Sequence, residues 1–217
     1  MIDISKKECY KTVSQTAEAT IIEKRSRFIA TVKPCQTEQE ALDFLAQVKK
    51  KYSDANHNVY AYVIDENNIF RYSDDGEPQG TAGMPVLDTI RKSEIVDCAV
   101  VVTRYFGGTL LGTGGLVRAY GKTAHDGLNA AKVVTRRLCD VVEVKAEYTL
   151  SGKIEHFISE QKFLCDTPIY ANDVTYTLYI PKDKTDKLKN DLQELTNARA
   201  YVKITGEEYK DEREILL

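Results

Sequence analysis

The sequence contains no long apolar run and no excess of positive charge. Its 217 residues include 30 basic and 33 acidic side chains, for a formal net charge of −3 at pH 7. No segment reaches the roughly 20 apolar residues of a membrane-spanning helix, and the N-terminus has no stretch suited to a signal peptide. We therefore expect a cytoplasmic protein without a membrane partner. Any nucleic acid must be recognised by a local group of cations, because the whole chain provides no attractive field.

Paired cysteines are also missing. The five cysteines are odd in number, widely spaced and never form a Cys-x-x-Cys pair. This pattern argues against a disulfide framework and against a structural zinc site. We expect reduced thiols, and neither a metal nor a cofactor.

The elements that are present divide the chain into two predicted domains, 1–135 and 136–217. In the first, Ala41, Leu42, Leu45 and Val48 recur at helical spacing and predict a helix. The segment Ala99–Val102 is apolar on both faces, which predicts a central buried strand with Cys98 buried beside it. We also expect one or two strands at 18–35, a hairpin around the turn 65–68 and a short helix at 85–92.

The second domain alternates between periods of two and of 3.6. Strands are expected at 141–150, 165–171, 173–180 and 198–205, and helices at 151–163 and 185–195. The order is βαββαβ, which is that of a split ferredoxin-like unit. The predicted fold class is therefore α+β.

The stretch RYFGGTLLGTGGLVRAYGKTAHDG, residues 104–127, resembles a nucleotide-binding loop but has the wrong spacing. A P-loop needs four residues before Gly-Lys-Ser/Thr, whereas five residues separate Gly115 from Gly121. An apolar stripe also places the Gly-Lys-Thr triplet inside a helix. The dinucleotide fingerprint fails too, because Val117 occupies the position of its third glycine.

The same stretch still favours an anion. No Asp or Glu occurs between Cys98 and His125, and the glycines place backbone N–H groups at the start of a helix whose dipole favours negative charge. Arg118, Lys122 and His125 share one face of that helix. We predict one anion- or nucleic-acid-binding surface, formed by Arg104, Gly107, Gly108, Gly112, Gly114, Gly115, Arg118 and Lys122. The alternative is that the glycines permit close packing and the basic face is merely solvated.

An acidic loop, DDGEPQGTAGMP, precedes this stretch. Its carboxylates could hold a divalent cation or act in catalysis, but Asp and Gly are also typical turn residues, and we favour a structural turn. His57 could form an acid–base pair with Asp74, although a simple hydrogen-bonded role is favoured. The residues expected to support the anion site are His57, Asp74, Asp75, Glu77, Gly80, Thr81 and Gly83.

Three segments together, VVVTRYFGGTLLGTGGLVRAYGKTA, DDGEPQGTAGMP and HNVYAY, resemble the signature of the IMPACT family and its bacterial YigZ-like branch. The resemblance spans most of residues 15–130. It implies a ribosomal-protein-S5-domain-2-like N-terminal domain and a ferredoxin-like C-terminal domain similar to the last domain of elongation factor G. Eukaryotic members regulate translation through an extra N-terminal domain without a counterpart in these 217 residues, so that circuit is not implied here.

These features predict a non-catalytic RNA- or ribosome-associated protein that acts in translation regulation. Two alternatives stay open: an enzyme acting on a small phosphorylated ligand, and a protein-binding adaptor. A closed pocket between loops 74–83 and 107–115 would favour the enzyme, and an open groove would favour the binding module. An exposed apolar patch would favour the adaptor.

The C-terminal sheet provides a second possible nucleic-acid surface. Alternation directs one set of residues toward the two helices, namely Val142, Val144, Ala146, Val174, Tyr176, Leu178, Ala200 and Val202. The opposite face would then carry Tyr170, Tyr179, Arg199, Tyr201 and Lys203, on which bases of single-stranded RNA could stack. No RNP-type motif accompanies these tyrosines, so cross-strand pairing that stabilises the sheet is the favoured interpretation.

Overall fold

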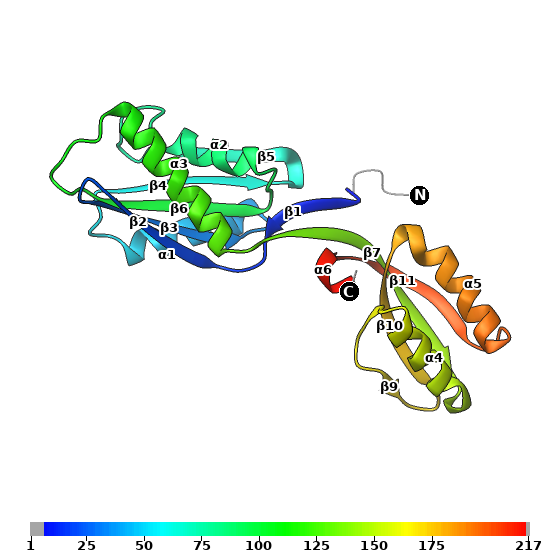
Figure 1. Cartoon of the computed structure of the whole chain (residues 1–217). Coiled ribbons are helices and arrows are strands. Elements are labelled where there is room, and N and C mark those ends of the chain that lie inside the picture. Colours follow the sequence, from blue (N-terminus) through cyan, green and yellow to red (C-terminus); the bar gives the residue numbers. More distant parts are fainter. Residues whose placement is uncertain (1–6, 216–217) are drawn as a thin grey trace. The chain divides into compact units, whose positions relative to one another are not determined.

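The computed structural model describes residues 7–215 and consists of two compact units (Figure 1). One unit is Lys11–Val134, and the other combines Met1–Tyr10 with Thr135–Leu217. The sequence pattern alone assigns the first ten residues to the N-terminal domain. In the structure residues 7–10 belong to the C-terminal unit, where the Leu138 amide donates to the Glu8 carbonyl over 2.8 Å.

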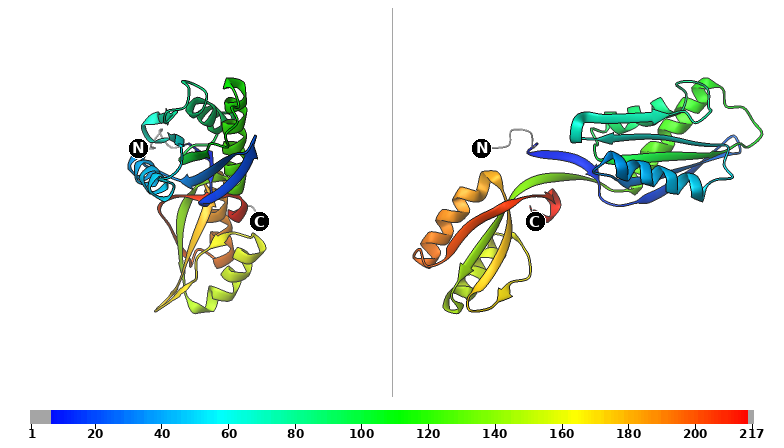
Figure 2. Two further views of the ribbon diagram at one scale, coloured as in Figure 1. Left: turned by 90° about the vertical axis from the view of Figure 1, so that its left-hand side faces the viewer. Right: turned by 180° about the vertical axis from the view of Figure 1, so that it is seen from behind.

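The unit Lys11–Val134 is built on a five-stranded antiparallel sheet with helices on both faces (Figures 1 and 2). The strand order is β2-β3-β6-β4-β5. The strands are β2 (Ala17–Glu23), β3 (Ser26–Pro34), β4 (His57–Ile64), β5 (Ile69–Ser73) and β6 (Cys98–Tyr105). Helices α2 (Gly83–Lys92) and α3 (Thr113–Ala130) cover one face, and α1 (Glu38–Lys51) covers the other.

The predicted central strand is confirmed. In β6, Val100 and Val102 pack against α2 and α3, while Ala99 and Val101 pack against α1. Cys98 is fully buried with them, and burial raises the pKa of its thiol far above the usual range. A strand covered on both faces reads as a continuous apolar run, which explains the pattern in the sequence.

The other predicted elements of this unit are present, with one error on α1. The hairpin is β4 and β5, joined through the turn at 65–68. On α1, Ala41, Phe44, Leu45 and Val48 are buried, whereas Leu42 is 45% exposed. Phe44 completes the i, i+3, i+4, i+7 stripe, and Leu42 lies off its axis.

The C-terminal unit has the predicted order of strands and helices. Two strands, β1 (Cys9–Val13) and β7 (Val133–Ala146), belong to it in part and continue into the other unit. Its other elements are α4 (Tyr148–Glu160), β8 (Leu164–Cys165), β9 (Ile169–Tyr170), β10 (Val174–Pro181), α5 (Thr185–Thr196), β11 (Tyr201–Asp211) and α6 (Glu212–Ile215). The sheet order is β1-β7-β10-β8, with β11 paired to β7 and β9 paired to β10. The apolar residues expected to face the two helices do form their core.

Two boundaries differ from the prediction. The strand expected at 141–150 ends at Ala146, because α4 begins at Tyr148. The single strand expected at 165–171 is divided into β8 and β9, with Pro168 between them. Proline cannot donate to the sheet, so it interrupts the strand.

Within the described residues, no helix is both long and apolar enough to cross a membrane.

Candidate anion-binding site

The glycine loop leaves β6 after Tyr105 and lies directly on the turn between β2 and β3. A Cβ added to Gly107 would lie 2.0 Å from the carbonyl carbon of Arg25, so only glycine fits this contact. Gly108 and Gly112 have φ of +81° and +74°, which glycine adopts without strain. The contact places the turn residues Lys24 and Arg25 beside the loop.

Unpaired amides lie at the end of this loop, where α3 begins at Thr113. The Leu116 amide donates to the Gly112 carbonyl over 2.9 Å. The N–H groups of Thr113, Gly114 and Gly115 have no acceptor within the described part of the chain. They stand at the positive end of an 18-residue helix. The Gly-Lys-Thr triplet lies inside α3, as predicted, and not in the loop.

A cavity of about 230 Å³ lies between the first turns of α3 and the β2–β3 hairpin. Three of its lining residues are basic and one is acidic. The lining consists of Ile21, Glu23, Lys24, Leu111, Gly115, Arg118, Ala119 and Lys122. The Arg118 guanidinium lies over the first turn, with Nη1 3.6 Å from the Cβ position of Gly114. Within residues 7–215, Lys24, Arg118 and Lys122 form no ion pair with an acid. An anion in the cavity would therefore meet an excess of positive charge.

The expectation that Arg104 joins this surface is wrong. Its side chain is buried, Nη1 donates to Glu77 Oε1 over 2.5 Å, and Nη2 donates to Ser26 Oγ over 3.5 Å. Alternation along β6 directs it to the same face as Val100 and Val102, under α3. Lys24 of the β2–β3 turn lines the cavity in its place. The basic run at residues 24–27 was the available signal, but the sequence pattern assigned it only to strands.

His125, expected on the same basic face, is exposed and does not line the cavity. The amide nitrogen of Asn129 lies 3.2 Å from His125 Nδ1.

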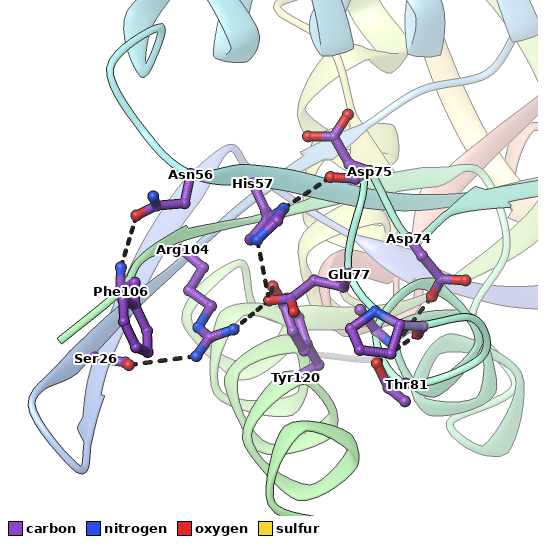
Figure 3. Close-up of polar contacts among 12 residues, drawn as sticks. Ser26, Asn56, His57, Asp74, Asp75, Glu77, Thr81, Arg104, Phe106 and Tyr120 are labelled. Carbon is purple, nitrogen blue, oxygen red and sulfur yellow. Dashed lines mark hydrogen bonds and ion pairs between the residues drawn. The ribbon is translucent and has the colours of Figure 1, made fainter. Parts of the chain in front are cut away.

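The acidic loop contacts β6 and α3 through Glu77 (Figure 3). The buried Glu77 Oε1 accepts hydrogen bonds from Arg104 and, over 2.8 Å, from the Tyr120 hydroxyl of α3. His57 Nε2 lies 3.8 Å away. Burial, followed by the Glu77 carboxylate, raises the pKa of Tyr120 far above its usual range, so the phenol remains a donor. Glu77 thus links the acidic loop, β6 and α3.

Asp74 and Asp75 hold the loop itself. Asp74 Oδ1 accepts from the amides of Ala82 and Gly83 over 3.1 and 2.8 Å, and its Oδ2 accepts from Gly80 over 2.9 Å. Asp75 Oδ2 accepts from the Asn58 amide over 2.6 Å. These are the contacts of a structural turn.

The remaining predicted support residues also contact the loop backbone. The Thr81 hydroxyl donates to the Pro78 carbonyl over 2.6 Å, and His57 Nδ1 lies 2.8 Å from the Asp75 carbonyl oxygen. His57 therefore contacts Asp75 and Glu77, and the proposed pairing with Asp74 is not formed. Residues 7–215 contain no group of three side chains suited to a metal ion.

The expected stacking face of the C-terminal sheet is formed only in part, because two of its tyrosines are unavailable for stacking. Tyr179 is only 8% exposed; it packs with Cys139 and Ile215, and its hydroxyl donates to Asp166. The Tyr170 hydroxyl donates to Glu155 of α4, so its ring lies on the helical side.

Tyr201 and Lys203 do lie on the expected face of the sheet. Tyr201 is exposed and pairs with Lys145 across the strands, and Lys203 pairs with Glu143. Arg199 Nε donates to the Thr196 carbonyl over 3.4 Å. Cross-strand pairing, the favoured interpretation, describes Tyr201 and Lys203.

The acidic loop is joined to β6, the strand from which the glycine loop leaves, by the buried Glu77–Arg104 contact. The cavity described above lies at the β2–β3 turn. Its only acidic lining residue is Glu23. The arrangement is suited to binding a phosphate-like anion with guanidinium, ammonium and amide donors.

Comparison with known proteins identifies two matching regions. Residues 24–128 match the Impact N-terminal domain, and residues 144–199 match a domain of unknown function, DUF1949. The chain is 43% identical over 195 residues to IMPACT family member YvyE of Bacillus subtilis (strain 168), covering 89% of this chain and 90% of that protein.

Two further similarities extend over most of the chain. IMPACT family member YigZ of Escherichia coli (strain K12) is 36% identical over 164 residues, which cover 72% of this chain and 78% of that protein. A crystal structure described as that of an hypothetical protein aligns with a TM-score of 0.58 at 28% identity, covering 90% of this chain and 97% of the other.

Proposed function

The chain belongs to the IMPACT family, and we propose that it is a cytoplasmic protein that binds RNA, free or within the ribosome, and acts in translation. One observation carries the proposal. Lys24, Arg118 and Lys122 surround a cavity at the start of α3, without an acidic partner among the described residues. The unpaired amides of Thr113–Gly115 lie at the same helix end.

The size of the cavity favours the backbone of a polyanion over a small metabolite. Small-molecule sites commonly enclose about 300–1,000 Å³, and this cavity has about 230 Å³. That volume suits one phosphate group, while the rest of a long anion would lie outside. The cavity lining also includes no histidine, serine or cysteine that could act as a base or nucleophile. The enzyme alternative therefore has less support than binding.

The folds give weaker support. We infer that Lys11–Val134 is ribosomal-protein-S5-domain-2-like and that the C-terminal unit is ferredoxin-like, because the latter has the βαββαβ order with β7 and β10 central and β11 beside β7. Similar domains occur together in elongation factor G, which favours a ribosomal partner. A fold by itself hosts many functions, so the proposal depends on the cavity.

The proposal predicts a specific salt dependence. Each lost phosphate contact reduces the slope of log K against log salt by about 0.7 for a single strand. The Arg118→Gln, Lys122→Gln double variant should therefore bind an RNA oligonucleotide more weakly, with a slope about 1.4 smaller. Fluorescence anisotropy between about 50 and 300 mM salt, which brackets the roughly 150 mM ionic strength of cells, measures both quantities.

A matched control distinguishes the site from general charge. Lys50→Gln with Lys92→Gln removes the same number of exposed cations from α1 and α2 of the same unit. It should leave the slope nearly unchanged. If both double variants lose affinity equally, or if the wild-type protein does not bind RNA, the proposed function is wrong.

A further inference from the structure

Phe106 is an exposed aromatic residue at the start of the glycine loop. It is 46% exposed, although it directly follows the buried strand β6. The guanidinium carbon of Arg104 lies 5.6 Å from the centroid of its ring and 5.3 Å from the centroid of the buried Phe28 ring. Phe106 therefore rests on a buried cation that is itself packed on the core (Figure 3).

The position of Phe106 is fixed from both its side chain and its backbone. Arg104 is held by Glu77 and Ser26. The Phe106 amide donates to Asn56 Oδ1 over 2.8 Å, and the next amide, of Gly107, donates to Ser26 Oγ over 3.1 Å. An exposed ring held in this way loses little conformational freedom when a planar group stacks on it.

The ring is also adjacent in the chain to the proposed anion site. Its neighbour Gly107 packs on the backbone of Arg25, and Lys24, which precedes Arg25, lines the cavity. A strand of RNA with one phosphate in the cavity would therefore pass close to Phe106. Aromatic rings accept any base by stacking, which suits a site whose other contacts are to the backbone.

We propose that Phe106 is a base-stacking residue for single-stranded RNA bound at the cavity of Lys24, Arg118 and Lys122. This inference rests on the proposed function. Lys24, Arg118 and Lys122 supply contacts to phosphate. Phe106 supplies a contact to a base, which allows the site to distinguish nucleic acid from polyanions that have no bases. The chain uses the buried Glu77–Arg104 pair to hold the ring in place.

The test compares two ligands, a single-stranded oligouridylate and inorganic polyphosphate, which has charge but no bases. Phe106→Ala should weaken binding of the oligonucleotide roughly 5- to 150-fold without changing its salt slope, and should leave polyphosphate binding unchanged. Phe106→Tyr should retain wild-type affinity, because it keeps the ring. Leu110→Ala is the matched control, since Leu110 is 82% exposed in the same loop but has no aromatic ring.

The outcomes separate the stacking proposal from the proposed function. Stacking is refuted if Phe106→Ala leaves the affinity for both ligands unchanged. It is also refuted if the variant binds both ligands equally more weakly while its circular dichroism spectrum is that of the wild type. If the Arg118→Gln, Lys122→Gln double variant keeps its RNA affinity and slope, the proposed function fails regardless of Phe106. Loss of oligonucleotide binding by Leu110→Ala as well would refute a specific role for the ring.

Discussion

Replacing Glu77 by glutamine should strongly destabilise the unit Lys11–Val134. Glutamine keeps the size of the side chain and an oxygen that can accept from Tyr120, but it removes the negative charge. Arg104 would then be a buried cation without its partner. Removing one member of a buried ion pair typically costs about 3–5 kcal/mol of unfolding free energy.

The double variant Glu77→Gln, Arg104→Met should be much less destabilised than Glu77→Gln alone. Burying two charges is expensive, so replacing a buried pair by groups of similar volume is often close to neutral. We expect the double variant to lie within about 1–2 kcal/mol of the wild type, which makes it about 2–3 kcal/mol more stable than Glu77→Gln alone.

Protection of the buried Cys98 thiol reports the unfolding of this unit alone. Pulsed labelling across a urea series, with the modified residue identified by mass spectrometry, gives the midpoint. A loss of 4 kcal/mol corresponds to a shift of about 2 M if the urea dependence is about 2 kcal/mol per molar. A loss below about 1 kcal/mol for Glu77→Gln would refute the reasoning, because water would then already reach the ion pair. A double variant no more stable than Glu77→Gln alone would refute it as well.

Two further predictions concern the same unit. On α3, Gly121→Ala should stabilise by roughly 0.5–1 kcal/mol through helix propensity, because its Cβ would meet only Thr89 Oγ1 at 3.6 Å. Gly127→Ala should destabilise by roughly 1–3 kcal/mol, because its Cβ would lie 2.7 Å from Ala30 Cβ and 2.9 Å from Val32 Cγ2, and urea midpoints that shift in the same direction would contradict this pair. Burial and Glu77 raise the pKa of Tyr120 in the folded state, so its contribution to stability is complete below the unfolded pKa of about 10 and is lost above it. Tyr120→Phe should therefore reduce the fall in stability above pH 10 by about 1.4 kcal/mol per pH unit, measured by urea unfolding at pH 8–11, and an unchanged slope would show that the folded phenol ionises freely.

The sequence predicted the elements whose own periodicity defines them. The apolar run of β6 consists of consecutive residues, and the stripe of α3 of residues three or four positions apart. Both can therefore be recognised from a short stretch of sequence. The position of Gly-Lys-Thr inside α3 followed from that stripe, and the family followed from the glycine-containing motifs. The same reasoning wrongly places Leu42 on the buried face of α1. This part of the helix has more apolar residues than its buried face can accommodate, so one of them is exposed.

The fate of individual polar side chains could not be predicted in this way. Alternation puts Arg104 on one face of β6, but only the fold brings Glu77 to meet it, from 27 residues away. Lys24 and Arg25 reach the glycine loop because of the β2–β3 turn, whose position depends on strand pairing. Tyr179 lies on the expected face of its strand, yet Ile215 and Cys139 cover it.

The width of the anion cavity is set at the far end of α3. Gly127 lets the helix touch β3 at Ala30 and Val32, and β3 begins at the turn that carries Lys24. Helix α3 and the β2–β3 hairpin, which both line the cavity, are therefore packed together at Gly127, about 14 Å along the helix axis from Arg118. A larger residue at position 127 would increase the distance between the helix and the hairpin without altering any side chain that lines the cavity. We therefore expect the size of anion that fits the proposed site to depend on a residue that does not line it.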